Sequence, residues 1–210
     1  MSNFSSFLPF FTAISNNNFP EPNFFLEQYT TSLDILKVYF DLIPITQNQS
    51  ILDLGIGTGL LSFMALKKGI SEAIGIDIDL KALKVARKIS KASNIKNLNL
   101  IHSSVEFLNL SKFKGHISGV IMNPPFGTKR KFLDFVFLKR AMQTNGWILT
   151  LHKKNSISDR KLHNLCQEHN YKIQSITTLV YSLPKTYEVH NLKFYKVEVN
   201  LYYLIPNLEF

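Results

Sequence analysis

Short apolar runs recur along this chain, separated by stretches with helical spacing, and this alternation most constrains what the sequence can fold into. Each run is bounded by Gly, Asn or Asp, as is typical of a buried strand. Strands that alternate with helices favour a parallel sheet covered by helices on both faces. We therefore expect strands at residues 50–55, 73–78, 98–102, 119–122 and 147–152.

The last third of the chain has a different pattern. Two long strand-like runs, 172–180 and 195–203, follow each other without an obvious helix between them, which predicts an antiparallel pair at the far edge of the sheet. In the second run, apolar side chains expected to be buried alternate with polar ones expected to face water. The apolar set is Val197, Val199 and Leu201, and the polar set is Lys196, Glu198 and Asn200.

Residues 1–25 differ from the rest in composition. They are rich in Phe, Ser and Asn and contain Pro9, Pro20 and Pro22, so we expect no long regular element there. The segment is predicted either to be loose or to dock on the body as an arm, through Phe4, Phe7, Phe10 and Phe11. Residues 26–210 are expected to form a single domain.

Composition bounds the function classes. A chain of 210 residues with 45% hydrophobic content suits one core, and Lys and Arg outnumber Asp and Glu by 24 − 15 = 9, which favours an anionic partner. The single cysteine, Cys166, excludes an internal disulfide and fits a reducing compartment. The six histidines lack ligand spacing, so no metal is expected. The apolar run at 8–14 is too short to cross a membrane, so we expect no membrane association and a cytoplasmic protein, or a nuclear or nucleolar one if the source is eukaryotic.

The strongest local signal is the sequence ILDLGIGTG at residues 51–59, where the first strand meets its helix. Gly55 and Gly57 allow a tight turn and let a ligand approach bare backbone. Dinucleotide enzymes space their glycines as G-x-G-x-x-G, whereas position 60 here is leucine. Asp53 would repel a pyrophosphate but can accept hydrogen bonds from an ammonium group. The turn therefore favours S-adenosyl-L-methionine, which has an amino acid end and a sulfonium.

The second strand ends in a pair of carboxylates. Asp77 follows Gly57 by 20 residues, at the tip of the neighbouring strand, where a carboxylate can accept hydrogen bonds from both hydroxyls of a ribose. Asp79 is expected to cap the next helix. Together with the glycine turn, Asp77 predicts a site for the adenosine half of the cofactor.

A second motif, NPPFG at residues 123–127, follows the fourth predicted strand. Its two prolines cannot continue the hydrogen bonds of a sheet, so the chain must leave the sheet there. The Asn123 side-chain oxygen and the Pro124 carbonyl can accept both hydrogens of a planar amino group, and Phe126 can stack on a base. These acceptors stabilise the amine as it becomes tetrahedral. We expect residues Asn123, Pro124, Pro125 and Phe126 to be catalytic, with an unpaired adenosine as target.

From about residue 26 to residue 203, the chain resembles the methyltransferase-like protein 5 family, which methylates adenine N6 in small-subunit ribosomal RNA. Besides the two motifs above, the resemblance includes LEQY at 26–29, GTK at 127–129, LHK at 151–153, and Tyr187 with His190. It implies a Rossmann-like class I methyltransferase, an α/β fold with a mostly parallel seven-stranded sheet and an antiparallel edge pair. It also implies a small zinc-containing activator subunit as a partner.

The resemblance assigns roles to single positions. It implies that Gln28, Tyr29 and Thr31 form a lid over the cofactor and that Asp53, Gly55, Gly57, Asp77 and Asn123 line its site. Two positions depart from the family pattern. Thr30 stands where the family has proline, which makes the lid less rigid. Ser104 stands where the family often has Asp to contact the cofactor adenine, and a hydroxyl is a weaker acceptor.

Basic residues near the predicted catalytic loop are candidate RNA contacts. Lys129, Arg130 and Lys131 follow the loop directly, and His152, Lys153 and Lys154 end the fifth strand. His190 is a candidate for the base pocket. Alternatives remain open: the amine could belong to a protein glutamine or to guanine N2, or the chain could be a non-catalytic RNA-binding protein.

Overall fold

The computed structural model of the chain describes residues 3–17, 26, 31–46, 48–127, 129–184 and 194–207. Its centre is one seven-stranded sheet. The strands are β1 (Ser50–Leu54), β2 (Glu72–Asp77), β3 (Leu98–His102), β4 (Gly119–Met122), β5 (Trp147–Lys153), β6 (Tyr171–Pro184) and β7 (Phe194–Pro206). The α-helices are α1 (Phe4–Asn17), α2 (Leu33–Leu42), α3 (Leu60–Lys68), α4 (Leu80–Ala92), α5 (Leu133–Met142) and α6 (Ser156–Glu168), with short 3₁₀ helices η2 (Val105–Phe107) and η3 (Leu110–Phe113).

The strand order is β3-β2-β1-β4-β5-β7-β6, which confirms the predicted fold class. The first five strands of this order are parallel, and helical segments connect them in the chain order β1 to β5. The late pair is antiparallel as predicted, and β7 inserts between β5 and β6. The five early strands lie within one residue of their predicted bounds.

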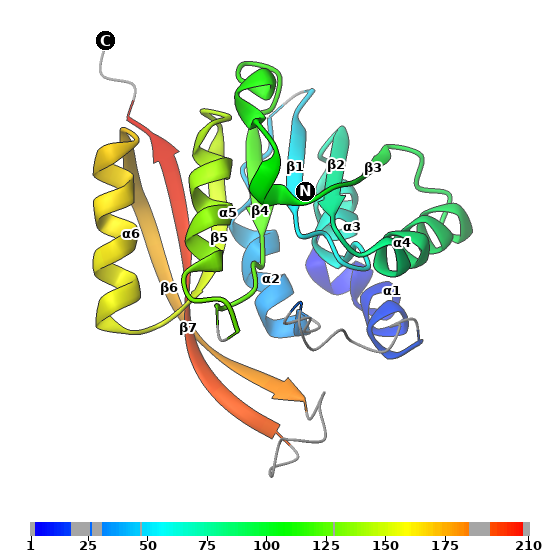
Figure 1. Cartoon of the computed structure of the whole chain (residues 1–210). Helices are drawn as coiled ribbons and strands as arrows, with labels where there is room; N and C mark the ends of the chain where they lie inside the picture. Colours follow the sequence, from blue (N-terminus) through cyan, green and yellow to red (C-terminus); the bar gives the residue numbers. More distant parts are fainter. Residues whose placement is uncertain are drawn as a thin grey trace.

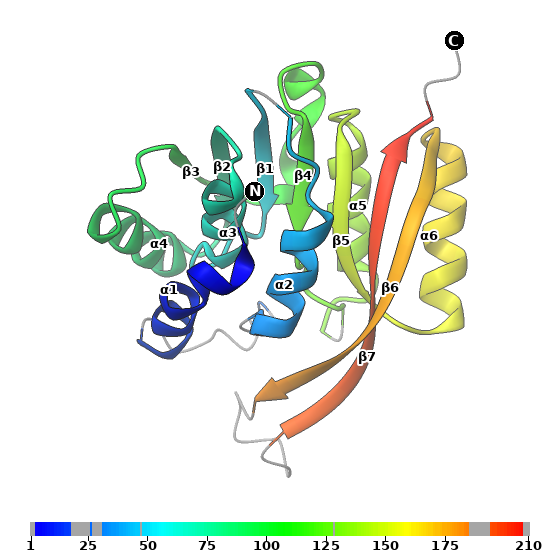
Figure 2. The same ribbon diagram turned by 180° about the vertical axis from the view of Figure 1, so that it is seen from behind.

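Helices cover both faces of the sheet. Figure 2 shows α1, α2 and α3 in front of one face, and Figure 1 shows α5 and α6 in front of the other. The apolar side chains form two cores accordingly: one joins the sheet to α1–α4, and the other joins it to α5, α6, η2 and η3. Leu52 and Val120 on adjacent central strands are fully buried, as parallel strands covered on both faces require.

The carboxyl ends of the five parallel strands share the lower edge of the sheet in Figure 1. At this edge β6 and β7 continue past the last pair of β5, Lys153 with Val199, and form a two-stranded ribbon up to Pro184 and Phe194. Figure 1 shows this ribbon projecting below the sheet. The ribbon therefore flanks the edge where loops can build a site.

The expectation of no long regular element in the N-terminal segment was wrong, because residues 4–17 form helix α1 with Pro9 inside it. Proline in a helix interior costs about 3 kcal/mol. Burial of one large apolar side chain contributes roughly 1.5–3 kcal/mol, and several are buried here, which offsets that cost. Phe4 and Phe11 are buried, and Phe4 packs edge-on against Phe40 of α2 at 5.4 Å. Within residues 4–17, the phenylalanines therefore pack against the body, as in the docked alternative.

The alternation predicted for the last strand holds except at one position. Val197, Val199 and Leu201 are buried, whereas Asn200, expected to face water, is only 5% exposed. Helix α6 covers it: the Asn200 amide donates to Asp159 at 3.2 Å and accepts from Thr178 at 2.8 Å. A polar side chain was therefore buried with its hydrogen bonds satisfied, which the period-two pattern alone does not reveal.

Candidate active site

The turn between β1 and α3 has the tight geometry that its glycines predicted. Gly55, Gly57 and Gly59 all have positive φ angles, of 75°, 56° and 95°. The amides of Gly55 and Ile56 both donate to the Ile76 carbonyl, at 2.8 and 3.1 Å, which folds the turn over the end of β2. A Cβ added at Gly57 would meet no atom within 4 Å. The turn therefore leaves open space beside bare backbone.

Asp53, at the end of β1, is a buried carboxylate with one unsatisfied oxygen. Its exposed fraction is 1%, and its Oδ2 accepts a 2.7 Å hydrogen bond from the Ser62 hydroxyl. Oδ1 is buried and has no hydrogen-bond partner among the described residues. Burial raises the pKa of Asp53 from 3.8 to about 7, the Ser62 hydrogen bond opposes this rise, and the charge of Asp77 adds to it. A buried oxygen of this kind needs a donor.

Asp77, at the end of β2, is fixed on the glycine turn. Its Oδ2 accepts from the Gly57 amide at 2.8 Å and its Oδ1 accepts from the Asp79 amide at 2.8 Å. Burial raises the pKa of Asp77, although these backbone hydrogen bonds act in the opposite direction. Asp79 caps α4, as predicted, by accepting from the Lys81 amide. Two nearly buried carboxylates thus end neighbouring strands, an arrangement that suits a ligand with cationic and hydroxyl groups and disfavours an anion.

The turn after β3 lies next to these carboxylates. The Ser103 amide donates to the Asp77 main-chain oxygen at 2.9 Å, and Ser104 is the half-buried residue that precedes η2. Ser104, predicted to face the cofactor adenine, therefore lies one residue beyond a direct main-chain contact with Asp77.

The predicted catalytic motif begins where β4 leaves the sheet. Asp53 is in register with Ile121 of β4, so Asn123 follows two residues beyond it on the neighbouring strand. The amide nitrogen of Asn123 donates to the hydroxyl of the buried Thr31 at 3.1 Å. Because this bond uses the nitrogen, the amide oxygen is the atom left to accept from a ligand. The structure thus brings together Thr31 and Asn123, which lie 92 positions apart.

Two tyrosines that the sequence reasoning missed support this motif. The hydroxyl of Tyr39, buried on α2, donates to the Met122 carbonyl at 2.6 Å and so fixes the residue before Asn123. Burial raises the pKa of Tyr39 well above 10. Tyr181, buried on β6, meets Phe126 edge-to-face with ring centroids 6.0 Å apart. No local motif marks either tyrosine, because each acts through a contact distant in sequence.

Phe126 remains half-buried at the edge of the core, and Pro124 is buried. The contact of Phe126 with Tyr181 joins the predicted catalytic motif to the base of the β6–β7 ribbon. The ring is therefore held by the protein while part of its surface stays accessible.

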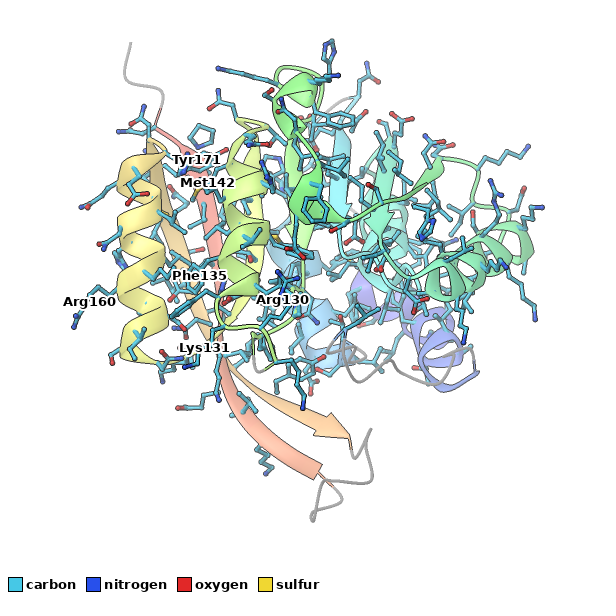
Figure 3. All side chains as sticks on the ribbon, in the orientation of Figure 1. Arg130, Lys131, Phe135, Met142, Arg160 and Tyr171 are labelled. Carbon is cyan, nitrogen blue, oxygen red and sulfur yellow. The ribbon has the colours of Figure 1, made fainter. Side chains whose placement is uncertain are left out.

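The predicted basic contacts differ in their surroundings. Lys129, Lys131 and Lys153 are exposed, and Figure 3 shows Lys131 low in the molecule, near the place where the ribbon leaves the sheet. Arg130 is exposed but forms a two-pronged ion pair with Glu106, at 2.6 and 2.7 Å. His190 lies outside the described residues, as do Gln28, Tyr29 and Tyr187.

The expectation that His152 contacts RNA was wrong, because it is 1% exposed. Its Nδ1 lies 2.8 Å from the Asp134 carboxylate and its Nε2 lies 2.9 Å from the Thr150 hydroxyl. Phe135 covers the ring at 5.1 Å between centroids. His152, the last buried residue of β5, is thus part of the core under α5, whereas Lys153 after it faces solvent.

Across the described parts of the chain, no group of three or more His, Cys, Asp or Glu side chains could hold a metal ion. None of the described helices is both long and apolar enough to cross a membrane.

Comparison with known proteins decides the family. The model of the methyltransferase small domain matches residues 35–174. The chain belongs to this family. It is 32% identical to the zebrafish (Danio rerio) rRNA N(6)-adenosine-methyltransferase METTL5 over 90% of the chain and 93% of that protein. It is 31% identical to the Methanocaldococcus jannaschii protein MJ0928, described as a candidate protein N5-glutamine methyltransferase, over 48% of each chain.

A solved structure agrees over the whole chain. The Pyrococcus horikoshii protein PH1948, described as a candidate RNA methyltransferase, superimposes with a TM-score of 0.82 and 26% identity, covering 98% of both chains. Membership of the class I methyltransferases implies S-adenosyl-L-methionine as cofactor. The residues described above fit this molecule, because an unsatisfied carboxylate oxygen, a second carboxylate and open space at Gly57 lie at one edge.

Proposed function

We propose that this methyltransferase modifies the N6 amino group of an adenosine in RNA, and that its substrate is small-subunit ribosomal RNA. One observation carries the proposal: the Asn123 amide nitrogen is bound to Thr31, so the amide oxygen is available as an acceptor beside Phe126. The similarity to METTL5 over most of both chains supports the same substrate.

The cofactor would be held at the ends of β1 and β2. Asp53 would accept from the amino group of its methionine end, Gly55 and Gly57 would offer bare backbone, and Asp77 would accept from the ribose hydroxyls. Ser104 would face the adenine. Gln28 and Tyr29, outside the described residues, would cover the site together with Thr31.

When bound, S-adenosyl-L-methionine supplies a methyl group on a positively charged sulfur. An amine nitrogen can attack the methyl carbon, and the sulfur leaves as part of S-adenosylhomocysteine. The chain's own residues hold that amine. The Asn123 side-chain oxygen and the Pro124 carbonyl accept its two hydrogens, and Pro125 keeps the backbone extended. Phe126 stacks on the base, which contributes about 1–3 kcal/mol. The surplus proton leaves to solvent after the transfer, so no general base is required.

The RNA backbone would follow the exposed lysines at the same edge. Lys129 and Lys131 follow the catalytic motif, and Lys153 ends β5 beside the ribbon. Cations placed along one path suit phosphates. His190 stays a candidate for the base pocket, and the zinc-containing activator subunit implied by the resemblance stays a prediction.

The similarity to MJ0928 covers about half of each chain and keeps glutamine methylation as the second candidate. The deciding experiment incubates the purified protein with labelled S-adenosyl-L-methionine and a cell extract from which this protein has been removed. We expect label in the RNA fraction, recovered as N6-methyladenosine after digestion, and none with Asn123→Ala. Label in protein, or in N2-methylguanosine, would replace the proposal by one of the alternatives. Cofactor binding without any transfer would favour a non-catalytic RNA-binding protein.

A further inference from the structure

Glu106 and Arg130 connect the two halves of the active-site edge. Glu106 belongs to η2, directly after the β3 turn, and Arg130 belongs to the loop between the catalytic motif and α5. Nη1 and Nη2 of Arg130 lie 2.6 and 2.7 Å from the two carboxylate oxygens of Glu106. Such fork geometry fixes orientation as well as distance.

The main chain at Glu106 is held independently. Arg140 of α5 donates to the Glu106 carbonyl through Nη2 at 2.6 Å and through Nε at 3.1 Å. The η2 turn is thereby anchored on α5, and its carboxylate is presented in a defined place to Arg130. The Glu106 side chain is only 20% exposed, so the pair is less screened than a fully solvated one.

The loop that carries Arg130 is tightly folded onto the catalytic motif. Gly127, directly after Phe126, has a φ of 71°, and a Cβ there would lie 3.0 Å from the Phe132 amide nitrogen and 3.1 Å from the Arg130 carbonyl. The Arg130 carbonyl also accepts from the Leu133 amide at 3.2 Å. The backbone of residues 130–132 therefore lies close against Gly127, the residue that follows Phe126.

The other end of the connection touches the cofactor residues. Ser103 donates to the Asp77 main chain, and Ser104 precedes η2. We propose that Glu106 and Arg130 are positioning residues that couple cofactor binding at the β2–β3 edge to the placement of the Phe126 loop for the substrate. This rests on the proposed RNA substrate, although its cofactor side can be tested alone.

The alternative role for Arg130 is that of a phosphate ligand. The two roles assign opposite effects to Glu106. If Arg130 binds phosphate, removal of the Glu106 charge frees the cation and tightens RNA binding. If the pair positions the loop, loss of either partner has the same effect, and the double variant adds nothing.

The experiment measures the dissociation constant for full-length small-subunit ribosomal RNA with and without saturating S-adenosylhomocysteine, and that of S-adenosylhomocysteine alone. The variants are Arg130→Gln, Glu106→Gln, both together, and Arg130→Lys. Arg160→Gln, the same change at an exposed position of α6, is the matched control, and Figure 3 shows Arg160 pointing away from the body of the protein. A ratio of dissociation constants measures the coupling between the sites and is reciprocal.

We expect the wild-type protein and Arg160→Gln to bind RNA about threefold tighter with the cofactor product than without it. In both single variants and in the double variant, the ratio of RNA dissociation constants without and with S-adenosylhomocysteine should fall to about one. Each of the three should also weaken binding of S-adenosylhomocysteine without RNA by a similar factor. Arg130→Lys keeps the positive charge but cannot form the two-pronged ion pair, so it should restore only part of the ratio and of the cofactor affinity. A wild-type ratio of one, or tighter RNA binding by Glu106→Gln, would overturn the proposal.

Failure of the proposed function would be distinct. A wild-type protein that does not methylate RNA fails the substrate assignment, whereas the cofactor measurement still decides the pair. If Glu106→Gln and Arg130→Gln bind S-adenosylhomocysteine as tightly as the wild-type protein, the pair does not position the cofactor site and the proposal is overturned.

Discussion

The side-chain amide of Asn123 donates to the Thr31 hydroxyl at 3.1 Å and thereby joins the proposed catalytic motif to the residue just before the N-cap of α2. The amide can rotate by 180° about its last bond, which would exchange its oxygen and nitrogen. The hydrogen bond to Thr31 holds the amide in place, and in the structure it uses the nitrogen and leaves the oxygen available.

Thr31→Val removes the hydroxyl while keeping the shape of the side chain. We expect kcat to fall about tenfold, because the lost hydrogen bond no longer holds the Asn123 amide in place and about 1.4 kcal/mol of transition-state stabilisation is lost. The dissociation constant for the cofactor should change less than twofold. Asn123→Ala should abolish transfer. Weaker cofactor binding with unchanged kcat would instead show that Thr31 acts as a lid residue.

Tyr39→Phe removes the hydroxyl that donates to the Met122 carbonyl. The acceptor is buried, so we expect a loss of about 1–3 kcal/mol in the free energy of unfolding, measured by urea denaturation. Tyr203→Phe, on a half-buried tyrosine of β7, should cost less than about 0.5 kcal/mol. Equal stability of the two variants would refute the structural role of Tyr39.

Cofactor affinity should depend on pH through Asp53. Only its ionised form can accept a cationic amino group favourably, and its pKa is about 7 in the protein without ligand. We therefore expect binding to be about eightfold weaker at pH 6 than at pH 7.5, measured by calorimetry. Asp53→Asn should bind weakly at both values, with no such dependence. A flat profile for the wild-type protein would contradict the assignment.

The same pKa has a consequence for stability. The unfolded chain releases the Asp53 proton near pH 4, whereas the folded chain retains it to about pH 7. The stability contributed below pH 4 is therefore lost as the pH rises from 4 to 7, by up to roughly 4 kcal/mol. Asp53→Asn should be more stable than the wild-type protein at pH 8 without cofactor, with the difference shrinking toward pH 4. A constant difference would exclude this titration.

Asp134→Ala leaves His152 without its partner in the core between α5 and β5. We expect it to lower the free energy of unfolding by roughly 3 kcal/mol, because both side chains of the pair are nearly inaccessible. Asp34→Ala, on the exposed first turn of α2, should cost less than about 1 kcal/mol. A small effect at Asp134 would mean that water satisfies the histidine.

Local chemistry decided the parts of this molecule that the sequence predicted well. The bend at Gly55 and Gly57 needs positive φ angles, and the departure of the chain after Asn123 follows from two prolines, so each could be assigned from neighbouring residues. The buried strands were likewise predicted from short apolar runs bounded by Gly, Asn or Asp. These features place the two motifs at the carboxyl ends of neighbouring strands.

Contacts between distant residues decided what the sequence could not. His152 was expected to contact RNA, but it is buried beside Asp134, and the pairing of Arg130 with Glu106 was likewise not evident from the sequence. Asn200 was expected to face water, but α6 covers it. Pro9 was expected to prevent a helix, but burial of Phe4 and Phe11 offsets its cost. Residue type and spacing fix backbone geometry over a few positions, whereas burial and hydrogen-bond partners depend on which surfaces the folded chain brings together.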